Sequence, residues 1–191
     1  MFQASLRATL LLLVLCCGLY PALVTGLAQT LFPDEASGSL LRDGEGRIVG
    51  SALIGQASAS PAYLHGRPSA AGRGYDAQAS SGSNLGLSNP RIAERRAAER
   101  ARLLAENPDA PGPVPEALLA ASGSGLDPHL PPEAAAWQLP RIAAARGVAP
   151  SRLQALLDEL TEGRDLGLLG EPRVNVLRYN LELDHRFPQV R

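Results

Sequence analysis

The residues best suited to chemistry are gathered in one short run, Ser122-Gly123-Ser124-Gly125-Leu126-Asp127-Pro128-His129. Serine, aspartate and histidine together form nucleophilic triads, so a hydrolase that uses the Ser122–His129 loop is one alternative for the function. Triads are normally assembled from distant parts of a fold, however, and the Gly-x-Ser-x-Gly turn of α/β-hydrolases does not occur in this sequence. The run favours a tight turn in which Ser124 or Asp127 caps neighbouring backbone amides.

Other kinds of chemistry have weaker support. A P-loop and the Asp-Lys-Thr-Gly phosphorylation sequence of P-type ATPases both need a lysine, and the chain contains none, so we expect no ATP hydrolysis by either route. The glycine-rich run 80–86 could hold an anion through its N–H groups, but such runs are more often turns. The isolated histidines His65, His129 and His185 lack ligand spacing, so we expect no metal site. The net charge of −1 gives no reason to expect nucleic acid.

An uncharged, apolar stretch lies between Arg7 and Asp34. At about 1.5 Å per residue it is long enough to cross a hydrocarbon core of about 30 Å, so we predict a transmembrane helix over 8–32. A cleaved signal peptide, with Gly26-Leu27-Ala28 as a weak cleavage site, is the alternative. Arg7 before the span favours a cytoplasmic tail, 1–7, and an exported domain, 34–191. Both cysteines fall inside the span, which leaves that domain without a disulfide.

The first half of the exported domain combines a hairpin, a long loop and a helix. Asp43-Gly44-Glu45-Gly46 between 39–42 and 47–50 predicts a β-hairpin. We interpret 55–89 as an ordered loop rather than a linker. A helix is predicted over 90–106, capped by Asn89, with a thin apolar stripe: Ala93, Ala97, Ala101 and Leu104. Its arginine-rich side is either a solvated face or a contact with an acidic partner or lipid headgroups.

The second half is mainly helical. We predict a short helix over 116–121 and a helix over 131–146 that Pro140 kinks or splits. A capping box at Ser151 starts an amphipathic helix whose apolar residues are Leu153, Leu156, Leu157 and Leu160. Residues 174–181 are predicted as a strand. The expected fold class is therefore α+β: one N-terminal transmembrane helix followed by one mixed α/β exported domain.

Motifs along the whole chain resemble the C-subunit family of the Kdp potassium-transporting P-type ATPase. They are Gly50-Ser51-Ala52-Leu53-Ile54-Gly55-Gln56, Tyr63, Gly66-Arg67-Pro68-Ser69-Ala70, Tyr75-Asp76-Ala77, Ser81-Gly82-Ser83-Asn84-Leu85-Gly86, Asn89-Pro90, the Ser122–His129 run, Ala134-Ala135, Gln138, Arg141, Gly170-Glu171-Pro172-Arg173-Val174-Asn175-Val176-Leu177 and Asn180. Each motif is weak alone, but the ordered set is specific. The chain departs from the family pattern at Ala57-Ser58-Ala59, which holds no phenylalanine, and at Leu64, where an aromatic residue is usual.

The resemblance implies a non-catalytic accessory subunit in the bacterial inner membrane. Its implied partners are a channel-like potassium-binding subunit (KdpA), a P-type ATPase subunit (KdpB), a small one-helix subunit (KdpF) and membrane lipid. It also implies a role in assembly and as a catalytic chaperone that raises the ATP affinity of the ATPase subunit, which itself carries ATP and Mg²⁺. Direct contact with ATP fits poorly with a cytoplasmic tail of about seven residues. The loop residues implied as partner contacts or structural supports are Gln56, Tyr63, Arg67, Tyr75, Asp76, Ser83, Asn84, Ser122, Asp127, His129 and Gln138.

Overall fold

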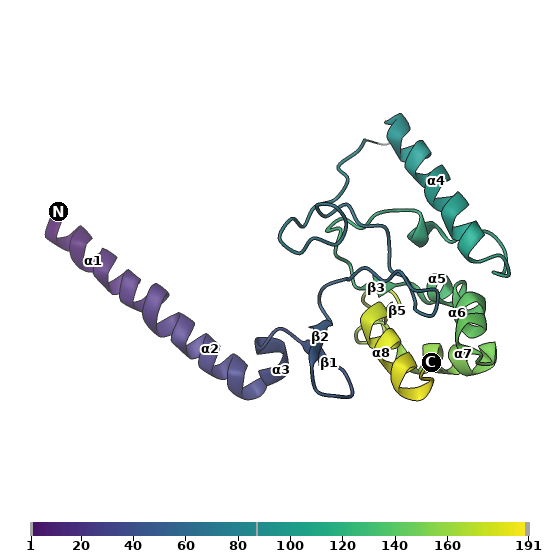
Figure 1. The fold of residues 1–191 in the computed structure, drawn as a ribbon. Coiled ribbons are helices and arrows are strands. Elements are labelled where there is room, and N and C mark those ends of the chain that lie inside the picture. The colour runs from purple at the N-terminus through teal and green to yellow at the C-terminus, as the bar shows by residue number, and fades with distance from the viewer. Residues whose placement is uncertain (1, 87, 190–191) are drawn as a thin grey trace. The chain divides into compact units, whose positions relative to one another are not determined.

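The computed structural model describes residues 2–86 and 88–189, which form two compact units, Met1–Leu40 and Leu41–Arg191 (Figure 1). The first unit is built around one long helix, and the second combines helices with short strands. The mixed α and β content predicted for the domain is confirmed.

The first unit contains a continuous helix of 30 residues, Phe2–Leu31, that is long and apolar enough to cross a membrane. It consists of α1 (Phe2–Val14), a π-helical turn η1 (Leu15–Leu19) and α2 (Tyr20–Leu31). Pro21 has no N–H group, and its ring crowds the carbonyl of Cys17, so the helix is widened just before the proline. The predicted apolar helix is present, but it spans Phe2–Leu31 rather than 8–32, so residues 2–7, expected as a tail, belong to it. That it crosses a membrane stays a prediction. A short helix, α3 (Pro33–Ala36), follows it.

The second unit begins with the predicted hairpin, formed by β1 (Leu40–Arg42) and β2 (Ile48–Ser51). The Asp43 carboxylate accepts hydrogen bonds from the backbone N–H groups of Glu45 and Arg47, each at 2.9 Å. Asparagine and aspartate stabilise turns in this way because their side chains replace a backbone acceptor.

The core of the second unit is a small antiparallel sheet covered by helices. Its strand order is β3 (His129–Leu130), β5 (Arg173–Asn175), β4 (Thr161–Glu162), and Val174 pairs with both Leu130 and Thr161. The helices are α5 (Pro132–Ala136), α6 (Leu139–Arg146), α7 (Pro150–Leu160) and α8 (Val176–Arg186). Fully buried side chains from these elements fill the core: Leu130, Ile142, Leu153, Val174, Tyr179 and Leu183.

The helical half of the chain agrees with the sequence-based prediction in part. The split near Pro140 is confirmed, because α5 ends before Trp137 and Pro140 lies in the first turn of α6. The helix over 153–160 is confirmed, but its capping box is wrong: α7 begins at Pro150, and Ala149 at its N-cap position makes no side-chain cap. The short helix over 116–121 is only a 3₁₀ turn, η2 (Glu116–Leu118).

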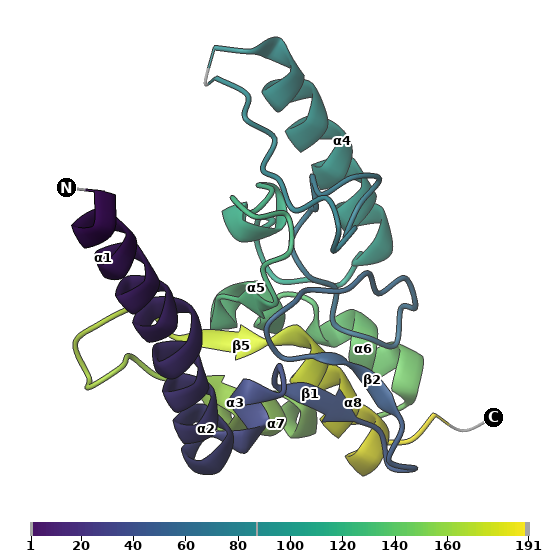
Figure 2. The ribbon, with the colours of Figure 1, turned by 90° about the vertical axis from the view of Figure 1, so that its left-hand side faces the viewer.

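The strand predicted over 174–181 is wrong beyond residue 175. The Asn175 side chain accepts a hydrogen bond from the backbone N–H of Arg178 at 3.1 Å and so caps α8. Figure 2 shows β5 leading directly into this helix. The buried residues of α8 are spaced three or four apart, as in a helix, at Val176, Tyr179, Asn180 and Leu183.

The helix predicted over 90–106 is confirmed as α4 (Pro90–Glu106), whose Asn89 cap accepts from the backbone N–H of Arg91 at 3.0 Å (Figure 1). Its orientation differs from the expected one. Leu103 is the buried residue, and the expected apolar stripe is exposed throughout: Ala93, Ala97, Ala101 and Leu104. On the inward side, an ion pair between Arg96 and Glu116 joins α4 to η2.

Candidate functional site

A cleft of about 280 Å³ lies between the long loop and helix α8. Four of the predicted loop residues line it: Gln56, Tyr63, Tyr75 and Asp127. The opposite wall is largely apolar and comes from α8, through Val176, Leu177 and Leu181. Gly55 fits here because a Cβ atom at this position would stand 2.7 Å from the backbone oxygen of Asp127.

The wall that carries Tyr63 is an irregular segment, 61–65, which is held by buried amide side chains. Asn180 accepts from the N–H of Leu64 at 2.8 Å and donates to its carbonyl at 2.9 Å. Gln138 accepts from the N–H of His65 at 3.0 Å and donates to its carbonyl at 3.0 Å. The two amides therefore take the place of a neighbouring β-strand.

Two buried arginines complete the support of this segment. Arg141 donates to the carbonyls of Pro61 at 2.5 Å and Tyr63 at 3.0 Å, and Arg146 donates to that of Ala62 at 2.7 Å. Every carbonyl from residue 61 to residue 65 thus accepts from a side chain of α6, of its N-cap residue or of α8. Burial lowers the pKa of Arg141 from its ordinary value, but an arginine stays charged under all ordinary conditions.

Tyr63 and Asp184 form one polar corner of the cleft. The Tyr63 hydroxyl donates to Asp184 Oδ2 at 2.8 Å, and Arg146 donates to Asp184 Oδ1 at 2.9 Å. The guanidinium of Arg146 also lies 4.9 Å from the centre of the Tyr63 ring. Burial and the hydrogen bond to Asp184 raise the pKa of Tyr63, so its hydroxyl stays protonated and acts as a donor.

Arg67 and Asp127 form a second polar corner. Arg67 donates to Asp127 Oδ2 at 3.2 Å, and the Tyr75 hydroxyl donates to the carbonyl of Arg67 at 2.5 Å. Contacts with His129 and Arg67 hold the pKa of Asp127 below its ordinary value, whereas burial raises the pKa of Tyr75. Each carboxylate of the cleft is therefore paired with an arginine, which leaves the cleft neutral and half apolar.

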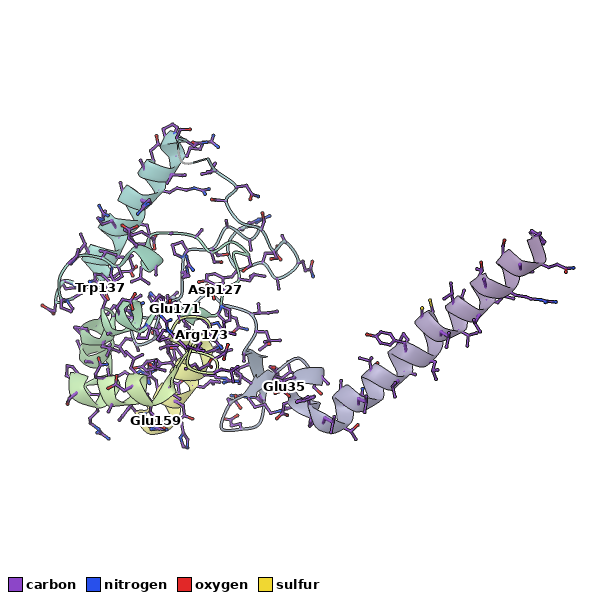
Figure 3. All side chains as sticks on the ribbon, turned by 180° about the vertical axis from the view of Figure 1, so that it is seen from behind. Glu35, Asp127, Trp137, Glu159, Glu171 and Arg173 are labelled. Carbon is purple, nitrogen blue, oxygen red and sulfur yellow. The ribbon has the colours of Figure 1, made fainter. Side chains whose placement is uncertain are left out.

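The Ser122–His129 run forms a turn and not a nucleophilic site. The buried hydroxyl of Ser122 accepts from the N–H of Asp127 at 3.5 Å. Asp127 Oδ1 accepts from the N–H of His129 at 3.0 Å, and the His129 ring nitrogen Nδ1 stands 3.7 Å from the same oxygen. Within residues 2–86 and 88–189, no hydrogen bond joins Ser122 to His129, so the serine has no general base. Asp127 (labelled in Figure 3) is bound to Arg67 and to the turn.

The remaining predicted residues lie outside the cleft. Asp76 caps a turn by accepting from the N–H of Gln78 at 2.9 Å. Ser83 and Asn84 are exposed, and Asn84 has a φ of +50°, which asparagine tolerates well. Gln138 is fully buried and acts on the cleft only through segment 61–65. In the described part of the chain, no group of three potential metal ligands comes together.

Sequence reasoning missed three residues that shape the cleft. Arg146 was expected only to end a helix, and Asp184 gave no signal at all. Asn180 was noted within a motif, but it was assigned to a strand and given no role. Its signal would have been a single asparagine in the otherwise apolar inner face of α8, since buried amides need specific partners.

Comparison with known proteins places almost the whole chain in one family. The family described as "KdpC: K+-transporting ATPase, c chain" matches residues 2–185. A "Potassium-transporting ATPase KdpC subunit" from Myxococcus xanthus is 59% identical over 186 residues, which cover 97% of this chain and 88% of the relative. Proteins of the same description from Nitratidesulfovibrio vulgaris and Geobacter sulfurreducens are 54% and 49% identical, over 95% and 92% of this chain and 92% of each relative.

Proposed function

Because the chain belongs to the KdpC family of potassium-transporting ATPase subunits, we propose that it supports the assembly of a high-affinity, ATP-driven potassium-uptake complex. The observation that carries this proposal is the family match over residues 2–185, which includes both the apolar helix and the domain with the cleft. The chain is a non-catalytic subunit, and ATP hydrolysis is carried by another chain of the complex. The proposed partners are the channel-like, P-type ATPase and one-helix subunits.

The geometry of the cleft suits a surface that binds another subunit. Its walls are fixed by buried side chains, and its carboxylates are already neutralised by Arg67 and Arg146. A neutral, half-apolar and rigid cleft binds a partner segment with little cost in ordering, since the site needs no rearrangement. The hydrolase alternative is not favoured, because Ser122 has a structural role in the turn.

The proposed location is the bacterial inner membrane, with a cytoplasmic N-terminus and an exported domain. Arg7, the single basic residue N-terminal to the uncharged stretch of the apolar helix, supports this orientation. ATP is cytoplasmic, so any rise in the ATP affinity of the ATPase subunit would be indirect and transmitted through packing between membrane helices. In this proposal the chain itself does not bind ATP or Mg²⁺.

Co-purification tests the assembly role directly. The chain, tagged at its C-terminus, would be expressed in its native host in low potassium and solubilised in mild detergent. We expect a channel-like subunit and a P-type ATPase to be recovered in equal amounts with it. Recovery of the chain alone, from cells that express both partners, would contradict the proposal.

A cleft variant tests whether this surface is used. Leu181→Gln places a polar group on the apolar wall of the cleft, and Leu104→Gln makes the same change on exposed helix α4. We expect the first variant to recover less of the partner subunits, and the second to recover the normal amount. Equal recovery by both folded variants would exclude the cleft as a subunit contact.

Nucleotide labelling tests the indirect route to ATP. The assembled complex would be treated with a photoreactive ATP analogue, and its ATPase activity would be measured at several ATP concentrations with and without this chain. We expect the label on the ATPase subunit alone, and a higher KM for ATP when the chain is absent. Label on residues 41–189 of this chain would overturn both the indirect route and the exported orientation.

A further inference from the structure

The loop between β4 and β5, residues 163–170, presents three leucines to solvent, and we call it the leucine hairpin. Leu166 is 91% exposed, Leu168 79% and Leu169 63%. Among the described residues of the second unit, these are the three most exposed large apolar side chains. Burying one leucine fully is worth roughly 1.5–3 kcal/mol, so a cluster of three in water is an unfavourable arrangement unless something covers it.

The leucine hairpin has a defined backbone, so the exposure does not come from a loose loop. Asp165 and Leu169 exchange two backbone hydrogen bonds, at 2.8 and 2.9 Å. The N–H of Leu168 also donates to the carbonyl of Asp165 at 3.1 Å. In Figure 2 the yellow-green loop that leads into β5 extends away from that strand.

Leu166, at the tip of the hairpin, has two unfavourable features: a left-handed backbone conformation and an exposed apolar side chain. Leu166 has a φ of +54° and Gly167 one of +73°, and hairpin turns with two such residues favour Asn-Gly or Asp-Gly. A leucine in the left-handed region is strained, and this one is also the most exposed of the three. An asparagine would remove both the strain and the apolar exposure, so folding of the isolated domain does not explain Leu166. Such outliers are often found at functional positions.

The base of the hairpin is charged but balanced. Arg164 pairs with Glu171 at 2.6 Å, and Arg173 pairs with Glu162 at 3.0 Å (Glu171 and Arg173 are labelled in Figure 3). Arg178 and Asp165 complete a set of three arginines and three carboxylates. An anionic bilayer surface attracts segments with a basic excess, and here there is none. The chemistry fits an uncharged, apolar groove on a protein, edged by polar groups.

We propose that the leucine hairpin inserts into an apolar groove on another subunit of the transport complex. The inference rests on the proposed function, because it takes the partner from that complex. Its hydrogen-bonded backbone holds the leucines in place before binding, so little conformational freedom is lost on docking. Leu166 and Leu168 are the anchors, and the ion-paired base forms the polar edge of the contact.

A double variant separates docking from folding. Leu166→Asn with Leu168→Gln removes the two most exposed leucines, and asparagine favours the backbone of position 166. We expect a thermal midpoint at or above that of the wild type. Recovery of the partner subunits from detergent-washed membranes should fall at least tenfold. The control, Leu104→Gln on α4, removes an equally apolar but single exposed leucine and should leave recovery unchanged.

The outcomes distinguish this inference from the proposed function. Normal recovery of the partners by the double variant would overturn the docking role of the hairpin and leave the accessory role standing. Failure of the wild-type chain to recover any partner would overturn both.

A crosslink from the hairpin identifies its neighbour. A benzophenone probe would be attached at Leu168→Cys in a chain that also carries Cys16→Ala and Cys17→Ala, and the purified complex would be irradiated. We expect a crosslink to another protein subunit. A crosslink to lipid alone, or no crosslink in an intact complex, would overturn the proposal.

Discussion

Segment 61–65 and helix α4 show opposite relations between regular structure and fixed position. Segment 61–65 has no regular secondary structure, yet each of its carbonyls accepts a hydrogen bond from a side chain of α6, of its N-cap residue or of α8. Helix α4 satisfies its own backbone over 17 residues, yet Leu103 is its only buried residue. The irregular segment is therefore part of the core, whereas the regular helix lies mostly in solvent.

Secondary structure and burial depend on different interactions in these two regions. A helix needs only local hydrogen bonds, so α4 can form with few tertiary contacts. An irregular segment must find partners for its buried N–H and carbonyl groups outside any ladder of helix or sheet, and here most of these partners are the side chains of Gln138, Asn180, Arg141 and Arg146. The rigid wall of the cleft is thus made by side chains that lie far from it in the sequence.

We expect Arg141→Met, which removes hydrogen bonds to segment 61–65, to have the largest effect on the free energy of unfolding. The change leaves the carbonyls of Pro61 and Tyr63 without their donor, and it also removes the partner of Asn107 Oδ1. Loss of a buried arginine from such a network should lower the free energy of unfolding by about 3–5 kcal/mol. Urea unfolding followed by circular dichroism measures the change.

The matched control for this prediction is Arg100→Met on α4. Arg100 is exposed and makes no ion pair with any described residue. Its free energy of unfolding should change by less than about 0.5 kcal/mol. If both variants lost a similar free energy of unfolding, segment 61–65 would not depend on its buried arginine more than α4 depends on an exposed one.

We expect Asn180→Ala to lower the free energy of unfolding somewhat less than Arg141→Met does. Asn180→Ala removes both hydrogen bonds to Leu64 and leaves a buried N–H and a buried carbonyl unpaired. The free energy of unfolding should fall by about 2–4 kcal/mol. Gln78→Ala, in the exposed part of the long loop, should be close to neutral in the same urea experiment. A neutral result for Asn180→Ala would mean that water replaces the amide, and segment 61–65 would then not depend on it.

The same distinction explains which predictions from sequence succeeded. The bounds of α4 follow from local signals, Asn89-Pro90 at its start and Asn107-Pro108 after its end. The split near Pro140 and the hairpin around Asp43 are local in the same sense. Elements like these can be predicted because neighbouring residues alone determine them.

The predictions that were wrong concern features that depend on contacts between residues far apart in the sequence. The apolar stripe of α4 was thin in the sequence. Which side of the helix faces the domain depends on Leu103 and on the ion pair of Arg96 with Glu116, and local sequence does not reveal either contact. In α8, β-prone residues hid a helix that is held by its Asn175 cap and by burial of Tyr179. In the cleft, four of the residues implied by the family resemblance line the walls, and their role as partner contacts stays a prediction. The side chains that support segment 61–65 are distant in the chain: Gln138 lies 73 residues from His65, and Asn180 lies 116 residues from Leu64.

Asn89→Ala removes the N-cap of α4, so we expect the stability of that helix alone to fall. N-cap asparagines typically contribute about 1 kcal/mol, and α4 has few tertiary contacts to spread the effect. We expect faster hydrogen exchange at the first turn of α4, with little change in the exchange of α6 and α8. Asn89→Asp keeps an acceptor and should restore protection. Faster exchange across the whole domain would show that α4 is coupled to the core, and would contradict the inference that this helix forms largely on its own.

The mildest perturbation is a change of pH, and it acts where the two regions meet. His65 ends segment 61–65, and its Nδ1 lies 3.8 Å from Oε2 of Glu106, the last residue of α4. Burial, and then the charge of Arg141, lowers the pKa of His65 below its ordinary value of 6.5; Arg102 adds to this, while the Ser60 carbonyl and Glu106 oppose it. The folded protein therefore holds this histidine neutral at a pH where the unfolded chain already binds a proton.

The sign of the pH dependence follows from that difference. The contribution of His65 to stability is complete above about pH 6.5, and it decreases as the pH falls through 6.5 towards the lower pKa of the folded state. His65→Gln keeps a donor for the carbonyl of Ser60 but cannot titrate, so its stability should change less over this range. Urea unfolding of both proteins between about pH 5 and 7.5 measures the difference. Parallel pH profiles would mean that the Glu106 carboxylate stabilises the protonated ring enough to cancel the effect of burial, and that α4 therefore contributes more to the core than its exposure suggests.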